Sequence, residues 1–369
     1  MNPGVLRIGV DAREVLGDAT GVGRYLAELL MRWTARGDAA SRRFVLFAPA
    51  GITLPLPSST VEMRVRPAAH GGTWWEQTAL RRAVQREPLD VFFAPAYTAP
   101  LGLTVPVVLT IHDVSFLAHP EWFRPRERWR RRWLTRRSAR TAAAVLTDSI
   151  FSRDEIARYV PLDPARIRVI PPGVTARHRG PRTDDPGNPL VLFVGTRLNR
   201  RRLPQLIDAF AAATADLPDA RLAIVGSDRT WPAQDLHAAA ERAGVAGRVD
   251  LRSYASDADL TELYGRASVF VFLSEYEGFG LTPLEALAAG VPIVVLDTPV
   301  AREIYGPAAT YVSPGATAAD AARPIRAALA REAKARQTLA AAPEVLARYS
   351  WDDAANWTLE AINEAARHR

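Results

Sequence analysis

The sequence of 369 residues contains no cysteine, so disulfide bonds and thiolate metal sites are excluded. This absence also favours a reducing compartment. No stretch reaches the 18 or more consecutive apolar residues that indicate a transmembrane helix. Met1 to Asp11 lacks a basic leader followed by a long apolar run, and Val5–Val10 is typical of a first strand instead. We therefore expect a soluble, cytoplasmic protein.

Lysine is nearly absent as well, since Lys334 is the only one among 47 basic residues. Arginine replaces it almost everywhere, so an arginine at a special position is weaker evidence of function here than in an ordinary chain. The charge is also uneven along the sequence. Residues 1–173 hold 25 arginines against 16 acidic residues, whereas the remainder carries a small negative balance within the net charge of +7. The positive excess therefore belongs to the first half.

Short apolar strands alternate with helices in the first half of the chain, and the same pattern restarts at residue 190. The predicted strands are Val5–Val10, Arg43–Phe47, Val91–Phe93, Val107–Thr110, Val145–Thr147, Leu190–Val194, Arg221–Val225, Val249–Leu251, Ser268–Leu273 and Val291–Leu296. The predicted helices are Val22–Arg36, Trp75–Arg86, Pro125–Thr141, Leu203–Ala213, Asp257–Arg266, Thr282–Ala289, a helical run from Thr317 to Leu346, and a terminal helix capped by Ser350. This alternation predicts an α/β fold with parallel sheets covered on both faces.

The chain is too long for one ordinary core, so two domains are expected. A polar stretch rich in proline, glycine and charge follows Pro171-Pro172-Gly173 and is the best linker. We predict an N-terminal Rossmann-like domain over 1–173, a linker over 174–189 and a second Rossmann-like domain over 190–349. The terminal helix, 350–369, is expected to pack back on the first domain. Two such doubly wound halves would face each other across a cleft.

Glu277 and Glu285 stand eight positions apart around a glycine-rich turn that joins a predicted strand to a predicted helix. Such a turn presents backbone N–H groups and the positive end of a helix dipole at the carboxyl edge of a parallel sheet, which favours phosphate binding. Thr282 and Glu285 also match a helix capping box, so Glu285 has a purely structural alternative. Glu277 has no obvious structural task, which favours a functional role.

Six short motifs occur in a characteristic order. They are Thr20-Gly21-Val22-Gly23-Arg24-Tyr25, Ile111-His112-Asp113, Asp148-Ser149, Val169-Ile170-Pro171-Pro172-Gly173-Val174, Val194-Gly195-Thr196 with Arg200-Arg201, and Glu277 to Glu285 followed by Ala286-Leu287-Ala288-Ala289-Gly290-Val291-Pro292. With these motifs the chain resembles the retaining glycosyltransferases of the GT-B architecture in the large GT4 family, over nearly its whole length. The resemblance implies transfer of a sugar from a nucleotide diphosphate donor.

The resemblance also implies a set of site residues. The implied catalytic residues are Glu277, His112, Arg200 and Arg201, and the implied donor-binding residues are Gly21, Gly23, Thr196, Tyr254, Phe279, Gly280, Leu281, Thr282 and Glu285. Two guanidiniums can neutralise a diphosphate as it leaves. The family usually has lysine at position 201, so Arg201 departs from the pattern. The planar guanidinium of arginine differs in geometry from the lysine ammonium, which acts as a point charge. Arg197 and Arg202 add further charge, part of which is expected in solvent.

Other implied roles have alternatives. His112 would contact a distal hydroxyl of the transferred sugar. Tyr254 would lie near the nucleobase, and the equally supported alternative is that it is a surface tyrosine at a strand end. Asp113 is interpreted as structural or acceptor-facing, because no second carboxylate lies nearby at metal-ligand spacing. The resemblance implies a metal-independent transfer with no cofactor beyond the donor. A phosphate oxygen of the donor would take the acceptor proton on the front face, without a protein nucleophile.

The most similar family members extend polysaccharide or O-antigen chains, which favours a mannosyltransferase that uses GDP-mannose, with a UDP-sugar as the other option. The acceptor would be a glycan or a lipid-linked glycan. A protein of the same fold without transferase activity, such as a nucleotide-sugar epimerase or a silent binding scaffold, is the alternative. The two glutamates together with Arg200 and His112 argue against it.

A segment from Arg124 to Arg140 contains nine arginines, with Trp129 and Trp133 one helical turn apart. It suits the surface of an anionic membrane or of a lipid-linked acceptor. The competing interpretation is a tryptophan stripe packed on the sheet with the arginines in solvent. Nucleic-acid binding is the least favoured reading, and we expect no nucleic-acid partner.

Overall fold

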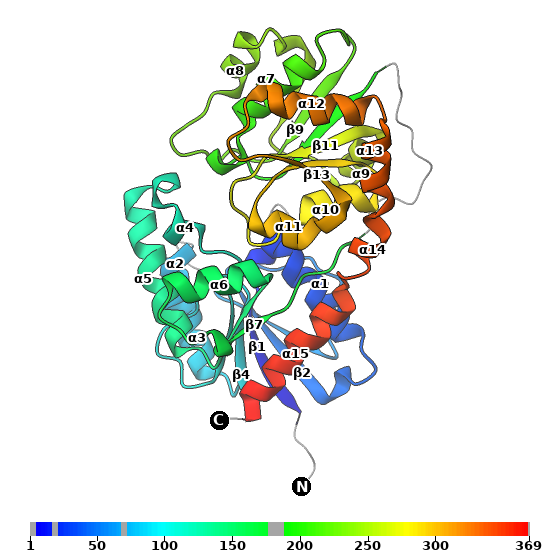
Figure 1. Ribbon diagram of the computed structural model, residues 1–369. Helices are drawn as coiled ribbons and strands as arrows, with labels where there is room; N and C mark the ends of the chain where they lie inside the picture. The colour runs from blue at the N-terminus through cyan, green and yellow to red at the C-terminus, as the bar shows by residue number, and fades with distance from the viewer. Residues whose placement is uncertain (1–4, 17–20, 68–71, 176–187, 368–369) are drawn as a thin grey trace. The chain divides into compact units, whose positions relative to one another are not determined.

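The structure is a computed structural model that describes residues 5–16, 21–67, 72–175 and 188–367 (Figure 1). The chain forms two compact units. Unit 1 contains residues 1–118, 125–173 and 350–369, and unit 2 contains residues 119–124 and 174–349. Each unit is a doubly wound α/β structure with one parallel sheet, so the predicted fold class is confirmed. No helix in the described ranges combines the length and the apolarity needed to cross a bilayer.

One short segment of the first half belongs to unit 2 rather than to unit 1, which the sequence did not indicate. Residues 119–124 group with unit 2. The ring of His119 meets that of Tyr276 edge-on at 5.4 Å, and the Arg124 guanidinium lies 5.2 Å from the centre of the Trp231 ring. The greater part of the predicted linker, residues 176–187, lies outside the described residues.

Unit 1 contains a seven-stranded parallel sheet in the order β3-β2-β1-β4-β5-β6-β7. Its strands are β1 (Leu6–Asp11), β2 (Arg42–Ala48), β3 (Val61–Val65), β4 (Val91–Ala94), β5 (Val107–Thr110), β6 (Ala144–Thr147) and β7 (Ile167–Val169). The two edge strands, β3 and β7, were not predicted. Their side chains are only partly buried, so they lack the apolar runs that identify the central strands.

The helices of unit 1 form two layers. They are α1 (Gly21–Ala35), α2 (Gly72–Trp75), a π-helical turn (Glu76–Leu80), α3 (Arg81–Arg86), α4 (Ser115–Ala118), α5 (Pro125–Thr141), α6 (Ile150–Tyr159) and α15 (Trp351–Arg367), besides short 3₁₀ turns. The strand order and right-handed crossovers place α2, α3, α5 and α6 on one face of the sheet. Helices α1 and α15 pack together on the other face (Figure 1). The predicted helix over Trp75–Arg86 is thus interrupted by a π turn.

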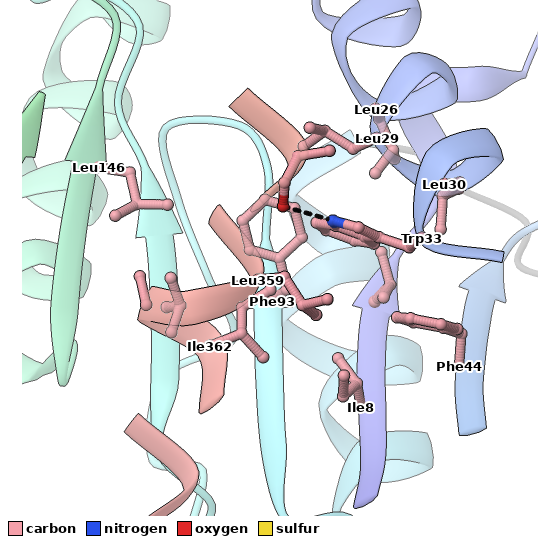
Figure 2. Packing of buried hydrophobic residues seen from close by; sticks show 14 of the residues in the cluster. Ile8, Leu26, Leu29, Leu30, Trp33, Phe44, Phe93, Leu146, Leu359 and Ile362 are labelled. Atoms are coloured by element: carbon pink, nitrogen blue, oxygen red, sulfur yellow. Dashed lines mark hydrogen bonds between the residues drawn. The ribbon is translucent and has the colours of Figure 1, made fainter. Parts of the chain in front are cut away.

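The terminal helix α15 completes the core of unit 1. The Trp33 indole donates a hydrogen bond of 2.8 Å to the carbonyl oxygen of Ala355 and stacks on Phe44 with ring centres 5.6 Å apart (Figure 2). Leu359 and Ile362 are buried in the same cluster. Helix α15 therefore shares with α1 the task of covering this face of the sheet, and it contacts β4, β5 and β6.

Unit 2 contains a six-stranded parallel sheet in the order β10-β9-β8-β11-β12-β13. Its strands are β8 (Leu190–Val194), β9 (Arg221–Val225), β10 (Val249–Arg252), β11 (Ala267–Phe272), β12 (Ile293–Leu296) and β13 (Ala309–Val312). Its helices are α7 (Leu203–Ala213), α8 (Leu236–Arg242), α9 (Asp257–Arg266), α10 (Leu281–Ala288), α11 (Pro299–Tyr305), α12 (Ala318–Leu329), α13 (Ala333–Ala340) and α14 (Ala342–Leu346). The edge strand β13 was not predicted. The strand order places the carboxyl ends of β8 and β11 side by side.

The packing of α15 gives a direct stability prediction. Replacing Ile362, which is fully buried, by alanine should lower the free energy of unfolding by about 2–5 kcal/mol, because the deletion leaves a cavity in a closely packed core. Denaturant unfolding measures this loss. Trp357→Ala on the exposed side of the same helix is the control and should cost about 0.5 kcal/mol or less. Equal losses in the two variants would contradict the packing of α15 on the sheet.

Candidate active site

The candidate site of unit 2 lies where β11 ends and α10 begins. The chain leaves β11, passes Ser274 and Glu277, and enters the helix through Gly280. Gly280 has φ of +92°, in the left-handed region, and a Cβ at this position would lie 2.1 Å from the Oη atom of Tyr305. Only glycine fits this backbone without strain. The turn therefore aims the first amides of α10, which have no intrahelical partner, at the carboxyl edge of the sheet.

Glu277 is held by three side chains at this edge. Arg201 donates from Nε to one carboxylate oxygen at 3.0 Å, and Arg200 donates from Nη2 to the other at 3.4 Å. The Ser274 hydroxyl donates to the first oxygen at 2.7 Å. The fold thus brings together three residues predicted for the site, Glu277, Arg200 and Arg201, and adds Ser274, which the sequence analysis did not single out.

The charge state of Glu277 follows from this arrangement. Burial by itself raises the pKa of the carboxyl, but the charges of Arg201 and Arg200 and the hydrogen bond from Ser274 outweigh it, so the pKa lies below its usual value. Glu277 is therefore a carboxylate at neutral pH. One negative charge between two guanidiniums leaves the cluster with a positive balance, which suits an anionic ligand.

The loop after β8 positions both arginines. Glu275 donates its backbone N–H to the carbonyl oxygen of Arg200 at 2.8 Å, and Arg201 donates from Nη1 to the carbonyl oxygen of Thr196 at 2.8 Å. Gly195, with φ of +148°, allows the close approach, because a Cβ there would lie 2.2 Å from the Nη1 of Arg201. Thr196 therefore acts on Arg201 through its backbone in this structure.

Arg202 is not a solvated arginine. Its backbone is left-handed, with φ of +51°, and it directs the side chain to Glu275 and to the carbonyl oxygen of Pro314, at 2.6 and 2.8 Å. Together with the Glu277 cluster, this pair gives the loops after β8 and β11 two ionic links. We interpret Arg202 as a structural anchor beside the site.

Glu285 is buried on α10 and accepts a hydrogen bond of 3.1 Å from Tyr264. The capping box considered for Thr282 and Glu285 is absent, because the helix begins one residue earlier and its N-cap is Gly280, without a side-chain cap. The helix-cap interpretation of Glu285 is therefore wrong. Its contact with ribose hydroxyls stays a prediction.

Tyr305, on α11, was missed by the sequence analysis. Its hydroxyl donates a hydrogen bond of 2.9 Å to the carbonyl oxygen of Gly280. Beside it, Phe279 meets Tyr349 edge-on with ring centres 5.1 Å apart. Burial raises the pKa of Tyr305 well above its usual range, and the Glu277 charge adds to the effect, so the hydroxyl stays a donor. No sequence signal identifies this residue, because the contact spans 25 positions and depends on the packing of α11.

Tyr254 follows β10 and is 59% exposed. Its proposed place near a nucleobase stays a prediction, as do the sugar contacts of the Phe279 and Gly280 amides.

In unit 1, His112 follows β5 and is buried. Its Nδ1 lies 2.8 Å from Oδ2 of Asp148 and its Nε2 lies 2.8 Å from the carbonyl oxygen of Pro95. Burial alone would lower the pKa of the ring, but the Asp148 carboxylate and the Pro95 carbonyl outweigh it, so the pKa is raised. Because both partners are acceptors, the geometry suits an imidazolium that donates twice. The predicted sugar contact stays a prediction, and it requires one of these two hydrogen bonds to be exchanged.

Other predicted positions of unit 1 lie at the same sheet edge. Asp113 accepts hydrogen bonds from the backbone and hydroxyl of Ser115, at 2.8 and 2.6 Å, which agrees with its structural interpretation. Gly21 and Gly23 lie in the first turn of α1, whereas Thr20 lies outside the described residues. Throughout the described ranges, no group of three His, Asp or Glu side chains is arranged to hold a metal ion.

A buried ionic cluster at this edge was not predicted. Arg13 pairs with Asp11 at 3.0 Å and with Glu76, and Thr98 donates to Glu76 at 2.7 Å. Burial raises the pKa of Asp11 to about 6, against the opposing charge of Arg13. These residues come from three separate segments, so only the fold reveals that they meet.

Comparison with known families gives a consistent result. Residues 19–178 match the family model described as Glycosyltransferase Family 4, and residues 175–345 match the one described as Glycosyl transferases group 1. The chain is 26% identical to O-antigen chain mannosyltransferase B of Escherichia coli over 80% of this chain and 83% of that protein. It is 34% identical to the GDP-mannose:cellobiosyl-diphosphopolyprenol alpha-mannosyltransferase of Xanthomonas campestris, over 45% of this chain and 43% of the relative.

The fold has a counterpart among solved structures. WaaG, a glycosyltransferase involved in lipopolysaccharide biosynthesis, aligns with a TM-score of 0.75 at 18% identity, over 96% of this chain and 99% of WaaG. At this identity the likeness shows the fold alone.

The pair of His112 and Asp148 predicts a pH-dependent stability. A raised pKa in the folded state means that the protonated ring stabilises the fold fully below the unfolded pKa of about 6.5, and that this contribution is lost as the pH rises through the folded value. Denaturant unfolding from about pH 6.5 upward should show the loss in the wild type and not in His112→Gln. The exposed residue His237 on α8 provides the control variant, His237→Gln, which should keep the wild-type slope. A wild-type slope in His112→Gln would contradict this assignment.

The contact between Tyr305 and Gly280 predicts a coupled pair of mutations. Tyr305→Phe should cost about 1 kcal/mol of unfolding free energy through the lost hydrogen bond. Gly280→Ala should cost more, because it adds backbone strain and a clash with the hydroxyl. In the double variant the clash with Oη is absent, so a double-mutant cycle should give a coupling of about 0.5–3 kcal/mol. Strict additivity would show that the two residues act independently.

Proposed function

Since this chain is a GT-B glycosyltransferase of family 4, we propose that it moves a hexose, with mannose favoured, from a nucleoside diphosphate sugar to a glycan or lipid-linked glycan, with retention of configuration. The observation that carries the proposal is the Glu277 carboxylate held between Arg200 and Arg201 at the start of α10. The favoured donor is GDP-mannose, with a UDP-sugar as the alternative.

The relatives support this choice of donor and acceptor. One curated relative is named an O-antigen chain mannosyltransferase, and the name of another specifies GDP-mannose and a diphosphopolyprenol-linked acceptor. The second alignment covers less than half of that relative, so it supports the class of reaction more than the particular substrate.

The donor diphosphate would bind between the two arginines and the N-terminal amides of α10 at Leu281 and Thr282. Anions bind favourably at such helix ends, and guanidiniums form strong hydrogen bonds with phosphate oxygens. Glu277 now accepts from one nitrogen of each arginine, Nη2 of Arg200 and Nε of Arg201. Diphosphate binding would therefore release part of this pairing, and the freed carboxylate oxygens would accept hydrogen bonds from the sugar hydroxyls.

Catalysis would rest on positioning and on stabilisation of charge. As the glycosidic bond to the donor breaks, negative charge grows on the diphosphate, and Arg200 and Arg201 would stabilise it. In the front-face route, a phosphate oxygen takes the proton of the acceptor hydroxyl. Because the arginines supply the positive charge, we propose that the transfer proceeds without a metal ion.

The remaining residues would define the donor. Glu285 would accept hydrogen bonds from the ribose hydroxyls, Tyr254 would lie beside the base, and His112 would contact the sugar. Gly21 and Gly23 would allow the backbone to approach the diphosphate. With a lipid-linked acceptor, the protein would act at a membrane surface. It would contact that surface peripherally through the Arg124–Arg140 segment.

A panel of nucleotides tests the donor site. We expect one of GDP, UDP, ADP, CDP and dTDP, with GDP favoured, to raise the melting temperature clearly, since a ligand at 100 times its Kd adds about 2.7 kcal/mol to the folded state. In Arg200→Ala this shift should shrink, and kcat with the matching nucleotide sugar should fall about 10²–10³-fold, as after loss of one preorganised donor.

Arg323→Ala, an exposed arginine of the same unit, is the matched control and should keep the wild-type shift and turnover. Wild-type turnover in Arg200→Ala would refute the role given to Arg200. The absence of a response to every nucleotide would favour a silent scaffold, and epimerisation of a nucleotide sugar without acceptor would favour the epimerase alternative.

A further inference from the structure

Helix α5 exposes its tryptophans instead of burying them. Trp129 is 70% exposed and Trp133 is 52% exposed, whereas Leu134, Ser138 and Ala139 form the buried side. The interpretation that the tryptophan stripe packs on the sheet is therefore wrong. Two large indoles one turn apart in water are an unusual surface for a monomer, and such a surface commonly marks an interaction site.

The same side of α5 carries unpaired positive charge. Arg126, Arg130, Arg137 and Arg140 are exposed, and their positions along the helix place them on the same face as Trp129 and Trp133. None of these four arginines forms a salt bridge among the residues that the structure describes. The helix's one acidic residue, Glu127, pairs with Arg131 at 2.8 Å. The stripe from Arg126 to Arg140 is about 21 Å long at 1.5 Å per residue.

A third exposed indole lies in the same helical layer. Trp74, in α2, is 66% exposed. Gln77, three residues later, donates to the carbonyl oxygen of Ala99 at 3.1 Å, and the Ser138 hydroxyl of α5 accepts from the backbone N–H of Ala99 at 3.1 Å. The two helices therefore flank the same loop. Both begin at the carboxyl edge of the sheet, because each follows a parallel strand, so Trp74 and Trp129 lie toward that edge and Trp133 lies one turn further along α5.

We propose that this face of unit 1, defined by Trp74, Trp129, Trp133, Arg126 and Arg130, binds the surface of a bilayer that contains anionic phospholipid. Indole rings prefer the headgroup region of a bilayer, where an apolar ring and a polar N–H are both accommodated. Guanidiniums beside them attract lipid phosphates. Proteins that bind single-stranded nucleic acid use a charged groove. The convex surface of an exposed helix suits the flat surface of a bilayer better than it suits a nucleic-acid strand. The inference depends on the surface of α5 and is independent of the proposed donor.

Co-sedimentation of the full chain with vesicles tests the proposal. At low salt we expect the protein to pellet with vesicles that contain phosphatidylglycerol and to remain in solution with phosphatidylcholine alone. Arg126→Glu/Arg130→Glu should lower the partition coefficient at least about 25-fold, since each basic residue near an anionic surface contributes a factor of about five. Trp129→Ala/Trp133→Ala should lower it comparably, and the addition of Trp74→Ala should lower it further.

Two control variants match these changes elsewhere on the chain. Arg242→Glu/Arg323→Glu reverses two exposed charges in unit 2, so it alters the net charge equally. Trp357→Ala removes a tryptophan that is 48% exposed on α15, on the other face of the sheet. Both controls should keep wild-type vesicle binding. All variants should keep the thermal shift given by the responding nucleotide, which separates a failure of membrane binding from a failure of folding or of donor binding.

Three outcomes would overturn the proposal. The first is an absence of pelleting with anionic vesicles at low salt. The second is an equal loss in the charge-matched control, which would show that net charge alone drives binding. The third is binding of a single-stranded oligonucleotide that depends on Trp129 and Trp133 while vesicle binding does not, which would assign the face to nucleic acid.

Discussion

The carboxylate of Glu277 accepts hydrogen bonds from Arg200, Arg201 and Ser274, and this shared charge joins the loop after β8 to the loop after β11. Breaking a buried ion pair from one side leaves an uncompensated charge, so each partner constrains the other two. The second link, between Arg202 and Glu275, joins the same two loops, which follow β8 and β11. The edge of unit 2 is therefore preorganised around a positive balance of charge, which is what a diphosphate leaving group needs.

The sheet edge of unit 1 has a different electrostatic character, although the topology is similar. There the charged groups satisfy one another: His112 with Asp148, and Arg13 with Asp11 and Glu76. In the Arg13 cluster one guanidinium faces two carboxyl groups, so this edge lacks the positive balance found in unit 2. The contrast supports the proposal that unit 2 binds the anionic donor and that unit 1 binds a neutral hydroxyl acceptor.

The predictable part of the site follows from local sequence. Glu277 stands out because a carboxylate after an apolar strand and beside glycines has no obvious structural task, whereas Arg200 and Arg201 were identified by their resemblance to a family motif. Ser274 and Tyr305 could not be predicted, since a hydroxyl becomes informative only when its partner is known. The edge strands β3, β7 and β13 were missed because partly buried strands carry weak alternation. The start of α10 was misplaced because Thr282-Pro283 is a strong local signal that the left-handed Gly280 overrides.

The α/β class, the central strands and the family could be predicted from local sequence, because buried parallel strands need continuous apolar runs and the site loops carry short motifs. Tertiary structure alone decided which charges meet and which side chains face water. The tryptophans of α5 illustrate the reason: a run in which arginines surround Trp129 and Trp133 gives nearly the same local pattern whichever side packs on the sheet. Only the burial of Leu134, Ser138 and Ala139 fixes the rotation of the helix, and with it the exposed face.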